Sequence, residues 1–197
     1  MSLSDGNLAE EFGQIDIYLF DQLLKGRIWP TDRVLDAGCG SGRNILYLMR
    51  MGCRVSAVDT NPDAVAGVRE LAQELEPGLP PESFRVEPVE HLSFIDADFD
   101  LVLSSAVLHF ARDAAHFHAM VNQMWRVLRP GGMLWARLAS SLPAGLGTPA
   151  DGPYSYLITP DQLEQLTAEL GGQLLDPIKT TLVHRSRSMT TWVVRKN

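Results

Sequence analysis

The chain is poor in cysteine and has no long run of apolar or basic residues. Its 197 residues include only two cysteines, Cys39 and Cys53, which match no metal-binding spacing. This argues against a disulfide framework and against a bound metal, and we expect reduced, buried thiols in a cytoplasmic protein. No apolar stretch approaches the roughly 20 residues of a membrane span, and no charged-then-apolar leader marks a secretory signal. We therefore expect no membrane association.

Positive charge is also scarce. Lysine and arginine total 17 against 24 aspartate and glutamate residues, giving a net charge of −7. Domains that hold nucleic acid through phosphate contacts are usually basic, so we expect a small-molecule partner and no nucleic acid. Because 45% of the residues are hydrophobic, the chain can bury a full core, and its length predicts a single domain over residues 1–197.

Short strand-like runs alternate with segments of helical periodicity. Apolar runs lead into Gly38 and recur at 55–59, 84–89, 99–104 and 133–139. The expected helices are 10–24, a segment from the glycines to Gly52, 62–75 with Asn61 as N-cap and Pro62 first, and 117–128. Alternation of this kind predicts an α/β fold with a parallel sheet covered on both faces.

The last third of the chain departs from this alternation. A helix is expected from Thr159-Pro160 to the glycines at 171–172, and residues 173–183 and 188–195 then form an antiparallel pair. Residues 140–156 are rich in small residues and proline, which predicts a mobile loop able to act as a lid. Residues 1–30 are expected to form an N-terminal helical cap.

Three glycines at alternate positions form the most informative motif. Gly38, Gly40 and Gly42 follow an apolar run and precede a helical segment. Glycine adopts positive φ freely and lets a ligand approach the backbone N–H groups at a helix start. Asp59 ends the next apolar run, at the usual distance for a carboxylate that binds ribose hydroxyls. The motif therefore predicts a site for a nucleoside-bearing cofactor.

The glycine spacing differs from that of a dinucleotide-binding loop. The third glycine comes one residue early, and Arg43 stands where it would be. Asp36 lies two residues before the first glycine, where its carboxylate would repel a pyrophosphate but suit a positively charged cofactor. A nicotinamide-dependent oxidoreductase stays as the less favoured alternative.

The segment Leu35-Asp36-Ala37-Gly38-Cys39-Gly40-Ser41-Gly42 resembles the first motif of the class I S-adenosylmethionine-dependent methyltransferases. The resemblance covers about residues 30–197. It implies S-adenosylmethionine as cofactor and a Rossmann-like three-layer sandwich, whose seven-stranded, mostly parallel sheet ends in an antiparallel hairpin. A monomer or a homodimer is expected. A protein that binds the cofactor without catalysis, such as a sensor, stays as an alternative.

The resemblance also assigns roles to individual residues. Asp59 matches the acid that binds both ribose hydroxyls, and the carbonyl of Ser104 matches a group that holds the methionine amino group. Pro88 stands where the family usually has an aspartate at the adenine, so Val89 and Glu90 are expected to reach the adenine edge instead. The expected cofactor-binding residues are Asp36, Gly38, Gly40, Gly42, Asp59, Thr60, Val89, Glu90 and Ser104.

The segment after the fourth expected strand bears on the acceptor. Ser104 to His109 lacks the Asn/Asp-Pro-Pro signature of enzymes that methylate base amines or glutamine amides, and its Leu-His pair is common in small-molecule methyltransferases. The chain is similar to the tellurite-resistance and thiopurine-type enzymes, which act on soft sulfur, selenium or tellurium nucleophiles. Such acceptors need no base. For others His109 is the candidate catalytic base, and a packing role for it is an equal alternative.

Three further residues are candidates for binding the substrate. Tyr18 and Trp29 could line the acceptor pocket from the N-terminal segment, although core packing is the more frequent role of a single aromatic residue. Arg43 could hold an anionic substrate, and its alternative role is a solvated position on the helix face.

Overall fold

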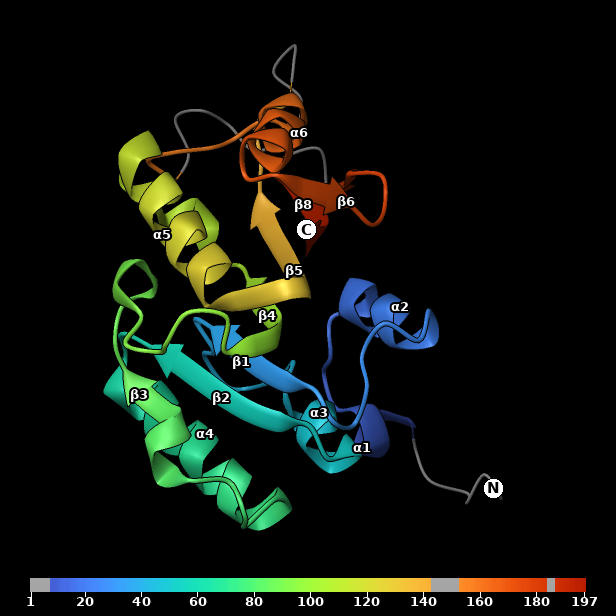
Figure 1. The fold of residues 1–197 in the computed structure, drawn as a ribbon, viewed down its shortest axis with the longest axis vertical. Helices are drawn as coiled ribbons and strands as arrows, with labels where there is room; N and C mark the ends of the chain where they lie inside the picture. Colours follow the sequence, from blue (N-terminus) through green and yellow to red (C-terminus); the bar gives the residue numbers. More distant parts are fainter. Residues whose placement is uncertain (1–7, 143–152, 184–186) are drawn as a thin grey trace.

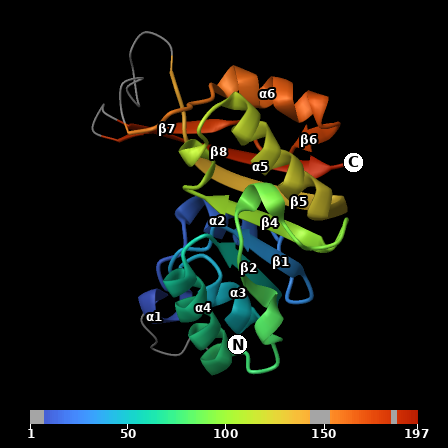
Figure 2. The same ribbon diagram turned by 90° about the vertical axis from the view of Figure 1, so that its left-hand side faces the viewer.

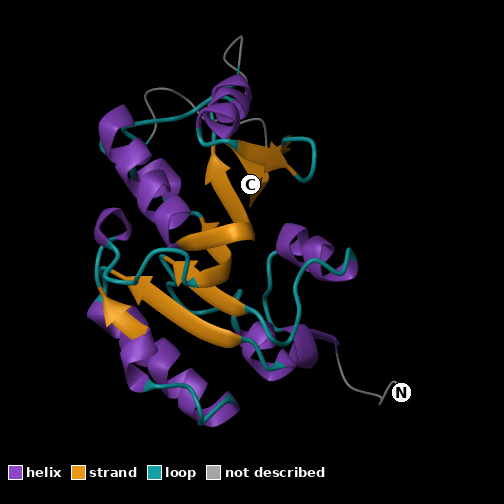
Figure 3. Cartoon of the chain, viewed as in Figure 1, coloured by secondary structure: helices purple, strands orange, loops and turns teal. Residues whose placement is uncertain are grey.

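A twisted β-sheet organises the chain in the computed structural model, which describes residues 8–142, 153–183 and 187–197. The strands are β1 (Arg33–Ala37), β2 (Arg54–Asp59), β3 (Phe84–Val86), β4 (Phe99–Ser105), β5 (Leu128–Ala139), β6 (Gly172–Leu174), β7 (Lys179–Val183) and β8 (Arg187–Lys196). Their order is β3-β2-β1-β4-β5-β8-β6, and β7 also pairs with β8 (Figures 1 and 3). The pairs from β3 to β5 are parallel, and β8 runs antiparallel to β5, β6 and β7.

Helices cover both faces of this sheet. They are α1 (Leu8–Phe12), α2 (Ile17–Leu24), α3 (Leu46–Met51), α4 (Pro62–Leu75), α5 (Ala114–Val127) and α6 (Pro160–Glu169). Buried side chains of α5 and α6 share one core cluster, while those of α2, α3 and α4 share another (Figure 2). The predicted Rossmann-like α/β sandwich, with a mostly parallel sheet and an antiparallel C-terminal end, is confirmed, but the described residues form eight strands where the resemblance implies seven.

The helix starts follow their sequence signals. The Asn61 side chain accepts a hydrogen bond from the Asp63 N–H, and Pro62 is the first helical residue of α4. Thr159 and Gln162 form a reciprocal capping box at the start of α6. These local bonds fix where each helix leaves the sheet.

The expected single helix over 10–24 is instead two helices. Gly13 has φ of +63°, which ends α1, and the Asp16 side chain accepts the Tyr18 N–H at 3.0 Å, which begins α2. The apolar periodicity continues across the break, and Phe12 of α1 packs against Phe20 of α2 with ring centroids 4.9 Å apart. Periodicity alone therefore predicted one helix too few.

Three expected strands have other bounds in the structure. The expected strand over 173–183 is split into β6 and β7, which lie along the same edge of β8, because Pro177 between them has no N–H to donate to a ladder. The strand expected to reach residue 89 ends at Val86, before Pro88. Finally, β5 begins at Leu128, and the predicted turn at 130–132 is an irregularity within it.

The structure also shows the state of the two cysteines, the grouping of metal-ligating side chains and the lengths of the helices. Cys39 and Cys53 are buried free thiols, and burial raises the pKa of both, that of Cys53 to about 12. Among the described residues no group of three metal-ligating side chains gathers. No helix in the same part of the chain is long and apolar enough to cross a membrane. Of the expected loop over 140–156, residues 143–152 lie outside the described residues.

Candidate functional site

A cavity of about 590 Å³ opens at the carboxyl ends of the parallel strands. This is the edge of an open α/β sheet where ligands generally bind. Its walls come from the glycine loop 38–44, from Asp59 and Thr60 at the end of β2, from 87–90, and from 105–107 at the end of β4. Parts of the segment 110–120 complete it. The cavity is large enough for a nucleoside-bearing ligand.

The three glycines of the loop have different surroundings. All have positive φ, at +90° for Gly38, +50° for Gly40 and +72° for Gly42. A Cβ on Gly38 would lie 2.3 Å from Val107 Cγ2, and one on Gly42 would lie 2.9 Å from Val68 Cγ2. A Cβ on Gly40 would meet no atom within 4 Å. Gly38 and Gly42 are therefore needed for close packing, whereas Gly40 leaves open space beside the cavity.

Asp59 at the end of β2 supports the loop. One carboxylate oxygen accepts the Gly40 N–H at 2.9 Å, and the other accepts the Asn61 N–H at 2.9 Å. The side chain also lines the cavity together with Thr60. A carboxylate held by two backbone N–H groups has a fixed orientation and keeps lone pairs for a ligand's hydroxyl groups.

Asp36 is a carboxyl group at the cavity whose ionisation is strongly perturbed. Its side chain is buried, and Oδ1 has no hydrogen-bond partner among the described residues. Burial raises the pKa of this carboxyl to about 7, an effect that Arg43 opposes and Asp59 reinforces. A buried carboxylate without a partner is costly, so this position favours a cationic ligand group.

The wall around Pro88 contains a charged cluster that sequence reasoning missed. Val89 and Glu90 line the cavity, as does His116 from α5. The Glu90 Oε1 lies 2.8 Å from His116 Nε2 and 3.7 Å from an Arg112 nitrogen. Burial raises the pKa of Glu90, but a backbone hydrogen bond and the His116 side chain outweigh it and hold the pKa below its ordinary value. The spacing of His116 gave no signal for this contact.

The end of β4 is tightly constrained. Ser105 and Ala106 line the cavity, whereas Ser104 is buried behind it, with its Oγ unpartnered among the described atoms. Ala106 has φ of +62°, an uncommon conformation for a residue with a Cβ, and its N–H donates to the Arg137 carbonyl at 2.7 Å. Such strain is frequent where backbone atoms are held for a ligand.

His109 lies behind the cavity wall. It is buried, its Nδ1 accepts the Ala139 N–H at 2.9 Å, and its ring packs against Phe110 and Tyr154. Burial, with a contribution from Arg187, lowers its pKa to about 4. Since the Nδ1 lone pair is used, the neutral ring carries its proton on Nε2 and cannot act as a base there. This geometry favours the packing alternative over the catalytic role.

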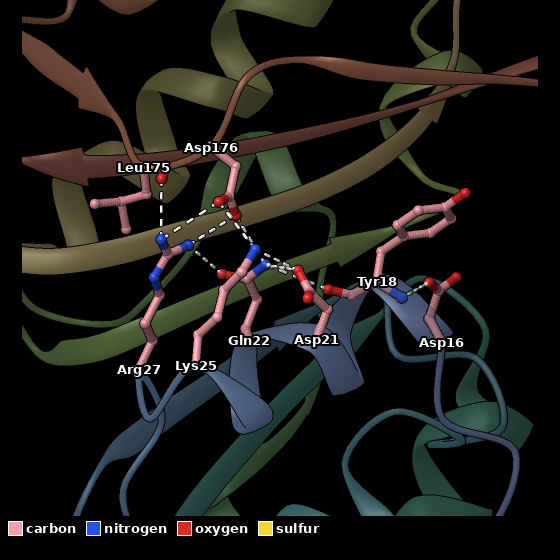
Figure 4. Close-up of polar contacts among 8 residues, drawn as sticks. All are labelled: Asp16, Tyr18, Asp21, Gln22, Lys25, Arg27, Leu175 and Asp176. Carbon is pink, nitrogen blue, oxygen red and sulfur yellow. Dashed lines mark hydrogen bonds and ion pairs between the residues drawn. The ribbon is translucent and has the colours of Figure 1, made fainter.

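Tyr18 and Trp29 lie outside the cavity, contrary to the prediction that they line it. The Tyr18 hydroxyl is 2.6 Å from Thr181 Oγ1, so this residue ties α2 to β7, and Figure 4 shows it on the helix beside Asp16. Trp29 precedes β1 and therefore lies at the amino end of the sheet, next to Asp32 and Arg129. That end is opposite to the glycine loop.

Arg43 does line the cavity. Its guanidinium donates to the Ser105 Oγ at 3.1 Å and to the Gln14 carbonyl at 3.2 Å, and it lies 3.6 Å from Asp16. Its side chain is still 39% exposed. The solvated alternative is therefore only partly correct, because these contacts hold the guanidinium at the cavity.

Comparison with known families gives a match over just more than half of the chain. Residues 35–136 match the methyltransferase domain family. The ubiquinone biosynthesis O-methyltransferase of Methylocella silvestris is 38% identical over 104 residues, covering 53% of this chain and 38% of that protein. The uncharacterized methyltransferase YodH of Bacillus subtilis is 36% identical over 113 residues, covering 57% and 45%. The chain thus spans less than half the length of these relatives.

Solved structures agree on the fold. A 1,6-didemethyltoxoflavin-N1-methyltransferase from Burkholderia thailandensis, with S-adenosylhomocysteine bound, has a TM-score of 0.70 at 24% identity and covers 97% of this chain and 81% of its own. TehB from Haemophilus influenzae has a TM-score of 0.71 at 20% identity, covering 93% and 63%. At these identities the likeness concerns the fold alone.

Proposed function

This chain belongs to the methyltransferase domain family, and we propose that it transfers a methyl group from S-adenosylmethionine to a small-molecule acceptor. One observation carries the proposal. Asp36 is a buried carboxyl group at a glycine loop, its Oδ1 has no hydrogen-bond partner among the described residues, and its raised pKa marks a position that favours a positively charged ligand group. S-adenosylmethionine has such a group at both its ammonium and its sulfonium.

The residues of the cavity fit the parts of this cofactor. Asp59 would hold the ribose hydroxyls while it supports the Gly40 N–H. Gly40 leaves room for the ligand to approach the loop. Thr60, Val89 and Glu90 line the same cavity, and in this proposal they contact the adenine. Ser104 is not on the wall, so only its backbone could contribute, as the family resemblance implies.

The bound cofactor would supply a methyl group already activated by its sulfonium. The acceptor's electron pair would form the new bond to that methyl carbon, and the sulfur would keep the pair of the broken carbon–sulfur bond as a neutral thioether. The protein therefore has to align the acceptor and exclude water, which can contribute on the order of 7–11 kcal/mol.

The acceptor proposed here is a small molecule with a soft or anionic nucleophile. Two observations support this choice. Arg43 presents a partly exposed guanidinium to the cavity, which suits an anion, and His109 is unavailable as a base. An acceptor that is already a thiolate or selenolate needs no proton removed.

A turnover measurement tests the proposed methyl transfer directly. The protein is incubated with S-adenosylmethionine and a panel of thiols, selenols, tellurite, phenols and amines, and S-adenosylhomocysteine formation is followed. Turnover on one class is expected. Tight binding of the cofactor without turnover on any class would instead indicate a non-catalytic binding protein, and binding of a nicotinamide cofactor alone would indicate an oxidoreductase.

The ribose assignment has its own test. Asp59→Ala should weaken S-adenosylhomocysteine binding about tenfold or more, because hydrogen bonds to a charged group are lost. Calorimetry measures this affinity, and Asp63→Asn, on the adjoining helix start, is the control. Unchanged affinity of the Asp59 variant would refute the assignment.

A further inference from the structure

The segment that connects α1 to α2 is hydrogen-bonded to the glycine loop. The Asp16 N–H donates to Asn44 Oδ1 at 3.0 Å, and the Gln14 carbonyl accepts from Arg43 at 3.2 Å. Asn44 is itself buried and lines the cavity. The N-terminal segment is thus attached to the site through its backbone at two points.

A third link is electrostatic and is made by the Asp16 carboxylate. The side chain is 1% exposed, and it caps α2 through the Tyr18 N–H. It also pairs with Arg137 of β5 and lies 3.6 Å from the Arg43 guanidinium. One buried carboxylate therefore stands between two guanidinium groups from different elements. Removing its charge would deprive both guanidinium groups of this buried carboxylate.

The Arg43 guanidinium retains binding capacity. A guanidinium has five N–H donors, and hydrogen bonds to the described residues Gln14 and Ser105 use only two of them. The group lines the same cavity as Asp36. The cavity therefore presents a carboxylate suited to a cation and a guanidinium suited to an oxyanion.

We propose that Asp16 is a positioning residue that holds Arg43 ready to bind a ligand carboxylate, with the Ser105 hydroxyl beside it. The carboxylate belongs either to the amino-acid part of the cofactor or to the acceptor, so the inference rests on the proposed function for its ligand. It adds that the N-terminal segment contributes to binding, although Asp16 itself does not touch the ligand.

The far end of α2 has a separate anchor, which makes the proposal testable. Asp176, between β6 and β7, accepts hydrogen bonds from Gln22, Lys25 and Arg27 (Figure 4). We expect this cluster to keep α2 in place when Asp16 is changed. In Asp16→Asn the amide can still cap the helix, so the substitution removes mainly the charge.

The experiment compares ligands with and without a carboxylate. S-adenosylhomocysteine and 5′-methylthioadenosine, which lacks the amino-acid part, are titrated by calorimetry into the wild type, Asp16→Asn, Arg43→Gln and the double variant. Asp21→Asn, a change in an exposed carboxylate on the same helix, is the matched control. If the cofactor carboxylate binds Arg43, both single variants should lose about tenfold or more in S-adenosylhomocysteine affinity and keep that for methylthioadenosine. The double variant should then lose no more than Arg43→Gln.

The acceptor carboxylate is tested in the protein saturated with S-adenosylhomocysteine. Benzoate binding that is lost in both single variants, with S-adenosylhomocysteine affinity unchanged, would place the carboxylate on the acceptor. The proposal is overturned if neither ligand responds to Asp16→Asn, or if the two cofactor fragments lose affinity equally, as a purely structural role predicts. A wild type that binds no S-adenosylhomocysteine refutes the proposed function instead.

Discussion

The Nδ1 atom of His109 accepts a hydrogen bond from the Ala139 N–H at 2.9 Å. This contact connects the turn after β4 with the end of β5, and it keeps the buried ring neutral. His109→Gln should therefore lower the free energy of unfolding by about 1–3 kcal/mol, since a buried donor loses its partner. Denaturant unfolding at pH 7.5 measures the change. The pH dependence of methyl transfer between about pH 6 and 8, roughly the range in which a histidine base titrates, should be the same in the variant and the wild type. A titration in that range that disappears in the variant would restore the catalytic role.

The same histidine predicts how stability depends on pH. Its pKa is about 4 in the folded protein, against about 6.5 in an unfolded chain. Between these values the unfolded state binds more protons, so stability should be complete above about pH 6.5 and fall as the pH decreases toward 4. Comparing unfolding curves of the wild type and His109→Gln over this range isolates the contribution, because the variant has no such group. Equal pH dependence in the two proteins would contradict the buried neutral state.

The glycine loop predicts two separable effects. Gly40→Ala places a methyl group in open space at a φ of +50°, so it should cost only about 1 kcal/mol of stability while weakening S-adenosylhomocysteine binding tenfold or more. Gly38→Ala would push against Val107 and should cost about 2–4 kcal/mol. Unfolding curves and calorimetry on both variants test this. A Gly40 variant with normal affinity would show that no ligand approaches the loop there.

Local signals explain why much of the fold could be predicted from the sequence. The alternate glycines, the Asn61-Pro62 helix start and the apolar strand runs each act within a few residues, so they predict the parallel sheet and the loop at its edge. The break at Gly13 was missed because apolar periodicity continues across it. The expected strand over 173–183 is split because Pro177 interrupts the ladder, which the alternating pattern alone does not show.

Side-chain direction and long-range contacts could not be predicted in the same way. His109 lies in the short helical turn that follows β4. Its ring points into the core, where it contacts the Ala139 N–H and Tyr154. The sequence pattern gives no signal for the ion pairs of Asp16, because its partners Arg43 and Arg137 come from distant parts of the chain. The packing of α5 against the turn at residues 89–91 likewise determines which wall residues meet.

Asp176 should contribute to stability through its cluster with α2. Asp176→Asn should lower the free energy of unfolding by about 1–3 kcal/mol, because charged hydrogen bonds to Lys25 and Arg27 are lost. These partners, with Gln22, lower its pKa to about 2 despite burial, so its contribution is present above about pH 4 and lost as the pH falls toward 2. Asp21→Asn, in the same cluster but more exposed, should cost less than about 1 kcal/mol. Equal losses in the two variants would contradict the assignment.

Asp36 should make the stability of the ligand-free protein depend on pH. Its pKa is about 7 in the free protein, against about 4 in an unfolded chain. The unfolded state therefore holds fewer protons between these values, and this carboxyl should reduce stability as the pH rises from about 4 to 7. Asp36→Asn removes that cost, so the ligand-free variant should be more stable than the wild type at pH 8, as measured by denaturant unfolding.

A cationic ligand reverses the balance, because it favours the ionised carboxylate. S-adenosylhomocysteine, through its ammonium group, should bind more weakly below pH 7, and binding there should release a proton. Calorimetry in buffers of different ionisation enthalpy measures that release, which Asp36→Asn should abolish together with about tenfold or more of the affinity. Glu74→Gln, on the exposed face of α4, is the control. Proton release that persists in the Asp36 variant would assign the titration to another group and remove the main support for a cationic cofactor.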